Sequence, residues 1–320
     1  MAIRGKNFKS LVSLGQKLVV ILGPTAVGKS DLAVKLAQKF HGEIVSADSR
    51  QVYQGMNIGT GKITPSEMGC IPHHLLDIIS PKIQFDVATY QKKATQAIQE
   101  ILKRRQLPFL VGGSPFYLDA ITKGWQFSKA KANPALRIAL AQKSLAELLK
   151  ILQVLDYHYF QKVEKDNKRR IIRAIEIASQ LGKVPPRKEN PQFQTLIIGL
   201  KLPLSELKKR IYQRLEKRFQ QGMIQEVENL HRQGLSWQRL EDFGLEYRWI
   251  SCYLQKKITI KEMKEKLQKE TEKFAKRQLT WFKKDPTIHW IQKQEEAQHL
   301  IQNFLKEKGF PKEKNYFKNS

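Results

Sequence analysis

The sequence predicts an α/β fold: a parallel sheet flanked by helices, with an all-helical insertion domain. Three observations support this prediction. Short apolar runs alternate with helical patterns in the first third of the chain, strand patterns are absent between residues 125 and 192, and a strand pattern returns at Gln194–Leu200. Alternating strands and helices are typical of parallel sheets, because each crossover helix packs on a face of the sheet.

The first strand is expected at Lys17–Leu22, an apolar run that ends at Gly23-Pro24, and a helix is expected over Ser30–Phe40. Residues Asn57–Pro81 carry many Gly, Pro and Thr residues and are expected to form irregular loop. Further strands are expected at Glu43–Ala47, Leu107–Val111, Gln194–Leu200 and Thr287–Ile291. Further helices are expected at Ala88–Arg105, Leu204–Gln220, Met223–Gln233, Glu246–Leu254 and Ile260–Lys284.

The insertion is predicted from helical periodicity without strand runs. Its helices are expected at Pro134–Leu152, Asp156–Glu164 and Lys168–Leu181. The predicted organisation is a basic N-terminal extension at residues 1–16, a core at 17–124 and 193–304, a helical insertion at 125–192 and a basic tail at 305–320.

The charge balance favours a polyanionic partner. The chain has 57 Lys and Arg residues against 30 Asp and Glu residues, a net charge of +27. Phosphates neutralised by such residues release counterions and add affinity, although a solvated lysine-rich surface is the simpler alternative. Charge alone does not separate RNA, DNA and acidic membranes. The longest apolar run, Leu18–Leu22, is too short to span a bilayer, and the two cysteines suit a reducing compartment, so cytoplasm is expected.

A phosphate-binding loop is the clearest motif. Residues Gly23-Pro24-Thr25-Ala26-Val27-Gly28-Lys29-Ser30 fit the pattern G-x-x-x-x-G-K-[ST] between a predicted strand and a predicted helix. The glycines let backbone N–H groups converge on phosphate oxygens, and the helix N-terminus adds positive potential. Lys29 supplies a point charge, and the Ser30 hydroxyl is a candidate ligand for Mg²⁺. The core is therefore expected to resemble that of P-loop NTPases.

The phosphate that this loop holds is a separate question. ATP or GTP is the default ligand, but such enzymes usually carry a Mg²⁺-binding acid after a later strand. The candidate strand Leu107–Val111 is followed by Gly112-Gly113-Ser114 and has no carboxylate. Asp48 follows the second strand, at the edge where open α/β sheets bind ligands. A loop-capping acid is the alternative role for Asp48.

Several segments together resemble one family. They are Gly23–Ser30, Ser46–Tyr53, Gly55–Lys62, Pro72–Asp77, Val111–Ser114, Arg170 with Arg173–Glu176, and Arg277–Phe282. On these motifs, from about residue 18 to residue 291, the chain resembles the bacterial tRNA dimethylallyltransferases, also called tRNA isopentenyltransferases. The stretch Pro72–Asp77, taken with the Asp48 segment, is far more specific than the phosphate loop alone.

The resemblance implies a reaction. The dimethylallyl group of dimethylallyl diphosphate would move to N6 of the adenosine 3′ of the anticodon (position 37), in tRNAs that read codons beginning with U, and diphosphate would leave. Asp48 matches the general base of the family, and Thr25 is expected to hydrogen-bond the diphosphate. The residues Gly23, Pro24, Thr25, Ala26, Val27, Gly28, Lys29, Ser30 and Arg248, with Mg²⁺ on Ser30, are expected to hold that group.

The resemblance also implies how the anticodon stem-loop is bound. Since nothing in the sequence demands a dimer, a monomer is expected. Expected tRNA contacts are Asp48, Ser49, Arg50, Gln51, Ser114, Arg137, Arg170, Arg173, Arg277 and Gln278. Residues 48–51 and Ser114 would meet the extruded base, and the three arginines of the insertion would grip the loop backbone.

The chain departs from the family pattern at three positions. Ser114 replaces a Thr, Gly61 replaces a common Ala and is expected to be harmless, and Glu246 stands before Tyr247 where a Gly is usual. The residues alone also allow three other functions. They are a P-loop nucleotide kinase with Arg170 and Arg173 in its lid, a non-catalytic RNA-binding ATPase, and a prenyltransferase that acts on free AMP.

Overall fold

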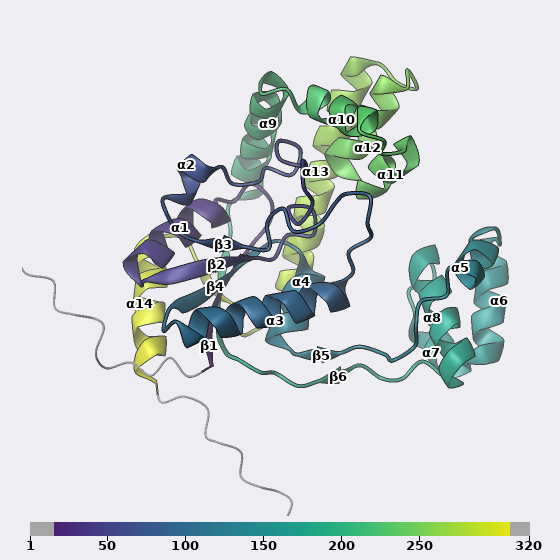
Figure 1. Ribbon diagram of the computed structural model, residues 1–320, viewed down its shortest axis with the longest axis horizontal. Helices are drawn as coiled ribbons and strands as arrows, with labels where there is room; N and C mark the ends of the chain where they lie inside the picture. Colours follow the sequence, from purple (N-terminus) through teal and green to yellow (C-terminus); the bar gives the residue numbers. More distant parts are fainter. Residues whose placement is uncertain (1–15, 308–320) are drawn as a thin grey trace, which may run out of the picture. The chain divides into compact units, whose positions relative to one another are not determined.

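A computed structural model describes residues 16–307 of the chain. The chain divides into two compact units: residues up to 124 together with residues from 191 onward, and residues 125–190 between them (Figure 1). The predicted N-terminal extension and basic tail lie outside the described residues, except for residue 16 and residues 305–307. Among the helices of residues 16–307, none is long and apolar enough to cross a bilayer.

The larger unit contains a six-stranded sheet in which every pairing is parallel, as the sequence predicts. Strand β1 (Lys17–Leu22) lies near its centre, and all six of its residues are buried. Because β1 has a neighbour on each side and helices on both faces, its sequence after Lys17 is a continuous apolar run. The strand order is β3 (His73–His74), β2 (Gly42–Ser46), β4 (Leu107–Gly112), β1, β7 (Gln194–Leu200) and β8 (His289–Ile291).

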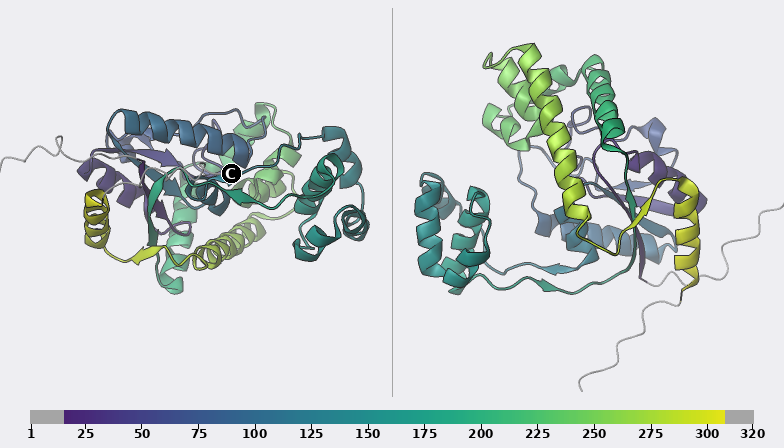
Figure 2. Two further views of the ribbon diagram at one scale, coloured as in Figure 1. Left: turned by 90° about the horizontal axis from the view of Figure 1, so that it is seen from below. Right: turned by 180° about the vertical axis from the view of Figure 1, so that it is seen from behind.

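Helices cover both faces of this sheet (Figure 2). On one face, α1 (Lys29–Lys39) and α14 (Gln294–Lys306) contribute to an apolar cluster with the strands. On the other, α3 (Val87–Lys103) and α4 (Pro115–Thr122) form a second cluster. The parallel sheet flanked by helices is therefore confirmed.

A group of five helices completes the larger unit (green in Figure 1). These are α9 (Leu204–Gln220), α10 (Met223–Arg232), α11 (Trp237–Phe243), α12 (Leu245–Leu254) and α13 (Ile260–Phe282). Their apolar faces share one core with Val52, Tyr53 and Met56, which follow β2 along the chain. This packing fixes the segment after β2 against the helices.

The smaller unit is helical, with a short strand pair where the chain enters and leaves it. Strands β5 (Trp125–Gln126) and β6 (Lys188–Glu189) pair antiparallel. The helices are α5 (Pro134–Ala141), α6 (Leu145–Leu155), α7 (Tyr157–Lys162) and α8 (Lys168–Leu181). The single helix expected over Pro134–Leu152 is wrong, because Ser144 and Glu147 form a capping box that begins a new helix at Leu145.

The predicted irregular loop Asn57–Pro81 contains two short elements. Helix α2 (Pro65–Met68) begins at a Thr64 capping box, and β3 adds a strand to the sheet edge. Helices α4, α11 and α14 were not predicted. Lys17 helps to hold α14, because its Nζ donates hydrogen bonds to the carbonyls of Leu305, at 3.0 Å, and Glu307, at 2.6 Å.

Candidate active site

Three neighbouring strands end at the same edge of the sheet. In the order β2, β4, β1, the register pairs Ser46 with Val111 and Leu22 with Gly112. The segments that follow these strands carry Asp48, Ser114 and the phosphate loop. Ligands of open α/β sheets bind at this carboxyl edge. The fold therefore gathers these sequence-predicted residues at one site.

The phosphate loop has the backbone of an anion-binding turn. Ala26 has φ of 66° and Gly28 has φ of 98°, both in the left-handed region. Successive N–H groups in such turns converge into a concavity that binds anions. Helix α1 begins directly after Gly28, so its N-terminal N–H groups and its dipole favour negative charge at the same place.

Lys29 carries an ammonium group with few compensating charges. Its Nζ donates a hydrogen bond to the Pro24 carbonyl at 2.7 Å. Burial, and then the positive charge of Arg214, lowers the pKa of Lys29 to about 7, against the opposing effect of Asp48. A bound anion would offset the cost of keeping the Lys29 ammonium charged, so the site favours anion binding.

Proton uptake on diphosphate binding is the first expected result. At about pH 8 much of Lys29 is neutral, and a bound diphosphate raises its pKa, so binding draws a proton onto Lys29. The affinity contributed by this lysine should therefore fall as the pH rises above about 7. Calorimetry of inorganic diphosphate in buffers of different ionisation enthalpy measures the uptake. Diphosphate itself also titrates, so the proton uptake of Lys29→Met is subtracted from that of the starting protein. Equal proton uptake by the two proteins would contradict the prediction.

Arg214 is a site residue that the sequence analysis missed. From α9, its Nη2 donates a hydrogen bond to the Thr25 hydroxyl at 2.5 Å. Its Nε is buried and has no hydrogen-bond partner within residues 16–307. Burial, and then the charge of Arg218, lowers the pKa of the Arg214 guanidinium. Lys29 and Arg214 thus place two poorly compensated cations beside the loop.

Gln278 braces the loop from α13. Its Oε1 accepts a hydrogen bond from the Thr25 N–H at 2.9 Å, and its Nε2 donates one to the Gly113 carbonyl at 2.6 Å. The residue is only 3% exposed. These contacts join the loop after β1 to the end of β4. Arg277, the next expected tRNA contact along the helix, is exposed, with its guanidinium 5.9 Å from the Phe274 ring centre.

Asp48 has the capping role that the sequence allowed, and its second carboxylate oxygen remains a candidate proton acceptor. Its Oδ1 accepts hydrogen bonds from the N–H groups of Arg50, at 2.8 Å, and Gln51, at 3.4 Å, so it caps the turn after β2. No hydrogen bond within the described part of the chain reaches its Oδ2. The side chain is half-buried. One oxygen holds the turn while the other is available to accept a proton.

The residues around Asp48 are held by a small hydrogen-bond network. The Ser114 hydroxyl accepts a hydrogen bond from the Ser49 N–H at 3.1 Å, which joins the ends of β4 and β2. The Gln51 Oε1 accepts one from the Ser46 hydroxyl at 3.4 Å, and its Nε2 donates to the Gly61 carbonyl at 3.2 Å. The Arg50 guanidinium lies 5.5 Å from the Phe243 ring centre. The predicted base-binding segment is thus a preorganised turn.

The structure does not bring Arg248 to the phosphate loop. Arg248 is exposed on α12, and its Nε donates a hydrogen bond to the Glu241 carbonyl at 3.1 Å. Among the described residues, the arginine that contacts the loop is Arg214. The physical reason lies in the helices: α9 turns its apolar stripe and Arg214 towards the core, whereas Arg248 follows the buried Glu246 and Tyr247 on the outer side of α12.

The arginines of the insertion are organised by one buried carboxylate. Glu176 is completely buried, and Arg137 donates two hydrogen bonds to it, at 2.9 and 2.8 Å. Arg173 also pairs with Glu176 and donates to the Ala130 carbonyl at 3.1 Å. Burial alone would raise the pKa of Glu176, but the hydrogen bonds from Arg137, the Asn133 N–H and Arg173 lower it to about 2.

Each of these arginines keeps part of its surface exposed. The side chains of Arg137 and Arg173 are 40% and 37% exposed, so Glu176 orients them without enclosing them. Arg170 forms an ion pair with Glu164 at 2.6 Å. The three predicted RNA contacts therefore lie on one small unit, two of them joined by Glu176.

Loss of the Glu176 charge is expected to affect both stability and RNA binding. In Glu176→Ala, Arg137, Arg173 and the Asn133 N–H lose their charged hydrogen-bond acceptor, at a cost of about 2 kcal/mol in the unfolding free energy. The stabilisation is present above the ordinary carboxyl pKa and is lost as the pH falls towards 2. Denaturant unfolding measures the loss, and the dissociation constant for an RNA stem-loop should rise. Glu164→Ala, which removes an exposed partner, is the control; an equal loss in the two variants would contradict the ordering role of Glu176.

Comparisons with known proteins agree with this site. Residues 51–285 match the IPP transferase family. The tRNA dimethylallyltransferase 2 of Trichlorobacter lovleyi is 43% identical over 279 residues, which cover 86% of this chain and 91% of that protein. The crystal structure of the tRNA isopentenylpyrophosphate transferase of Bacillus halodurans is 35% identical with a TM-score of 0.68, covering 91% of this chain and 95% of that one.

A third relative is a eukaryotic dimethylallyltransferase acting on tRNA, seen in crystallographic snapshots. It is 26% identical with a TM-score of 0.73, and the match covers 83% of this chain and 70% of that one. The family match spans most of this chain, and the alignments with the two bacterial relatives cover nearly the whole length of each relative. The predicted resemblance is confirmed, and the chain belongs to the IPP transferase family.

Proposed function

We propose that this protein transfers a dimethylallyl group from dimethylallyl diphosphate to N6 of an adenosine in tRNA. The observation that carries the proposal is the pairing of a cationic phosphate loop with Asp48. Lys29 and Arg214 lie at the loop without full compensation, and Asp48 presents a carboxylate oxygen that has no hydrogen-bond partner in residues 16–307. A diphosphate leaving group and a proton acceptor are the two requirements of this reaction.

The bond changes assign a role to each residue. The C–O bond between the dimethylallyl group and the diphosphate breaks, and the electron pair leaves with the diphosphate. Lys29, Arg214, the Thr25 hydroxyl and the loop N–H groups stabilise this developing charge. The lone pair of the adenine N6 forms the new N–C bond, and the proton of N6 moves to Oδ2 of Asp48.

Mg²⁺ fits the residues at the loop. The Ser30 hydroxyl is exposed in the first turn of α1 and makes no hydrogen bond within the described residues. Mg²⁺ bound to phosphates commonly keeps several waters and takes only one or two protein ligands, so a single hydroxyl is sufficient. When bound, the ion would neutralise diphosphate charge, which adds to the effect of Lys29 and Arg214.

The acceptor that we propose is the adenosine 3′ of the anticodon, at position 37, in tRNAs that read codons beginning with U. The base would leave the anticodon stack and meet Asp48, Ser49, Arg50, Gln51 and Ser114. Arg137, Arg170 and Arg173, with Arg277, would contact the RNA backbone, which agrees with the net charge of +27. Since tRNA is the acceptor, we expect the enzyme to act in the cytoplasm. We also expect a monomer, because nothing in the sequence demands a dimer.

The test is an incubation with labelled dimethylallyl diphosphate and, separately, unmodified tRNA or AMP. The proposal expects label on tRNA, and nucleoside digestion should recover it as an N6-substituted adenosine. Label on AMP alone would replace tRNA by a free nucleotide as the acceptor. Phosphoryl transfer from ATP without any prenyl transfer would overturn the proposal and favour a nucleotide kinase.

A further inference from the structure

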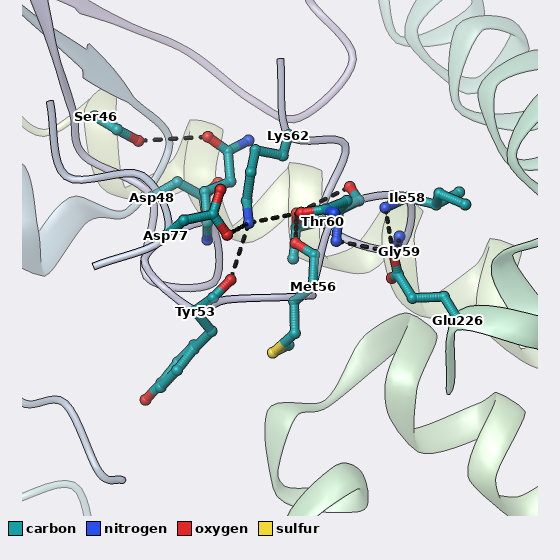
Figure 3. Close-up of polar contacts among 12 residues, drawn as sticks. Ser46, Asp48, Tyr53, Met56, Ile58, Gly59, Thr60, Lys62, Asp77 and Glu226 are labelled. Atoms are coloured by element: carbon teal, nitrogen blue, oxygen red, sulfur yellow. Dashed lines mark hydrogen bonds and ion pairs between the residues drawn. The ribbon is translucent and has the colours of Figure 1, made fainter. Parts of the chain in front are cut away.

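The loop Asn57–Lys62 is held by side chains that come from other parts of the chain (Figure 3). The Glu226 carboxylate, on α10, accepts hydrogen bonds from the N–H groups of Asn57, Ile58 and Gly59 at 2.8, 2.7 and 3.0 Å. At the other end, Lys62 Nζ donates to the Tyr53 carbonyl at 2.9 Å and pairs with Asp77 at 2.5 Å. These contacts restrain the loop backbone at both ends.

A buried ion pair lies directly beneath the same loop. Arg218, on α9, is 6% exposed, and Glu246, on α12, is 8% exposed. The Arg218 Nη1 lies 3.2 Å from Glu246 Oε1 and donates a hydrogen bond to the Gly59 carbonyl at 3.3 Å. Because removal of one partner from a buried pair leaves an uncompensated charge, this arrangement depends on both residues.

Gly61 leaves the space that Arg218 occupies. A Cβ atom at Gly61 would lie 1.6 Å from the Arg218 Nη2 and 2.7 Å from its Cζ. The departure from Ala to Gly at position 61 thus has a structural consequence in this chain: it leaves the space that the Arg218 guanidinium occupies. Two of the departures, Gly61 and Glu246, contact the same guanidinium: one leaves room for it and the other neutralises it.

Arg218 connects to both halves of the candidate site. Four residues along α9 from Arg218, and so on the same helical face, Arg214 contacts Thr25 of the phosphate loop, and the two like charges repel. On the other side, Arg218 supports the loop whose Gly61 carbonyl accepts the hydrogen bond from Gln51. The Gln51 N–H in turn donates to Asp48.

We propose that Arg218, held by Glu246 and fitted under Gly61, is a positioning residue that aligns the Asp48 turn with the Arg214 side of the diphosphate site. The inference rests on the proposed function, because its effect is measured as prenyl transfer. Arg218 itself would touch neither substrate. Its effect is expected in kcat, because a displacement of about 1 Å between base and leaving group is costly.

The first test uses two glycines with the same backbone conformation. Gly61 has φ of 59° and Gly69 has φ of 54°, but a Cβ at Gly69 would meet only Val34 Cγ1 at an ordinary 3.5 Å. Gly61→Ala should lower kcat by about tenfold to a hundredfold, with a KM for tRNA within about twofold of the starting protein. Gly69→Ala should leave kcat within about twofold. Equal kcat values for the two variants would overturn the proposal.

The second test separates positioning from stability. Arg218→Met leaves Glu246 buried and unpaired, so the variant should lose both stability and kcat. Combining Arg218→Met with Glu246→Gln should recover most of the melting temperature while kcat stays at least about tenfold low. Recovery of kcat together with the melting temperature would mean that the pair is only structural, which overturns the proposal.

A double-mutant cycle tests the contact itself. If Gly61→Ala acts by displacing Arg218, adding it to Arg218→Met should cause little further loss, whereas independent losses would multiply and contradict the proposal. The affinity for inorganic diphosphate is measured on every variant, because this measurement needs no turnover. If the unmodified chain transferred no prenyl group, only the proposed function would be rejected. The double-mutant cycle would then be evaluated with the diphosphate affinities instead of kcat.

Discussion

The Asp48→Asn variant is expected to lose about 10²- to 10⁴-fold in kcat while it still binds dimethylallyl diphosphate and tRNA. The amide of Asn retains an oxygen that accepts the N–H groups of Arg50 and Gln51, so the turn after β2 should persist. The lost group is the carboxylate oxygen that, in the proposed reaction, takes the proton from N6. Single-turnover prenyl transfer at saturating tRNA measures the effect on chemistry directly.

Asp86 provides the matched control for this variant. Its Oδ1 accepts a hydrogen bond from the Thr89 N–H at 2.8 Å and caps α3, and Asn is an equally good cap. Asp86→Asn should therefore leave kcat unchanged. Retention of full kcat by Asp48→Asn would show that Asp48 acts only as a capping acid, which is the alternative that the sequence allowed.

The Arg214→Met variant is expected to lose about 10²- to 10³-fold in kcat. The guanidinium contacts Thr25 of the phosphate loop, and its buried Nε has no protein partner within residues 16–307, which supports the proposed contact with the diphosphate. The inhibition constant of inorganic diphosphate should rise in parallel, because product and leaving group use the same contacts. Steady-state kinetics with diphosphate as inhibitor measures both quantities.

The control for Arg214 lies one turn earlier on the same helix. Arg210 is exposed, and its Nε is 2.9 Å from Glu206. Surface pairs of this kind contribute little, so Arg210→Met should be nearly neutral in kcat. Equal losses in Arg210→Met and Arg214→Met would attribute the effect to the total charge of α9 and contradict a specific diphosphate contact.

The sequence predicted the sheet well because its strongest signal is local. The run Leu18–Leu22 is apolar throughout, and the structure has β1 over Lys17–Leu22, as predicted. By contrast, β3 has only two residues and depends on pairing with β2, so the local sequence does not predict it. The break between α5 and α6 does not follow from the apolar periodicity, which continues across it; the signal that marks it is the Ser144–Glu147 capping box.

The site was predicted only in part, for a similar reason. Motifs identified the phosphate loop and Asp48, since both are contiguous in the sequence. Arg214 and Arg218 were missed because α9 carries many cations and charge alone does not show which face packs inward. A signal was present: both arginines follow the stripe of Leu207, Ile211 and Leu215, the buried side of the helix. An arginine within an apolar stripe is a candidate for a buried contact.

The ligand of the phosphate loop is the central claim, and direct binding tests it best. Calorimetry should show dimethylallyl diphosphate binding to the chain with Mg²⁺, binding that is strongly weakened in Lys29→Met. ATP should be neither hydrolysed nor used as a phosphate donor. Lys29-dependent turnover of ATP, together with no measurable binding of dimethylallyl diphosphate, would contradict the account.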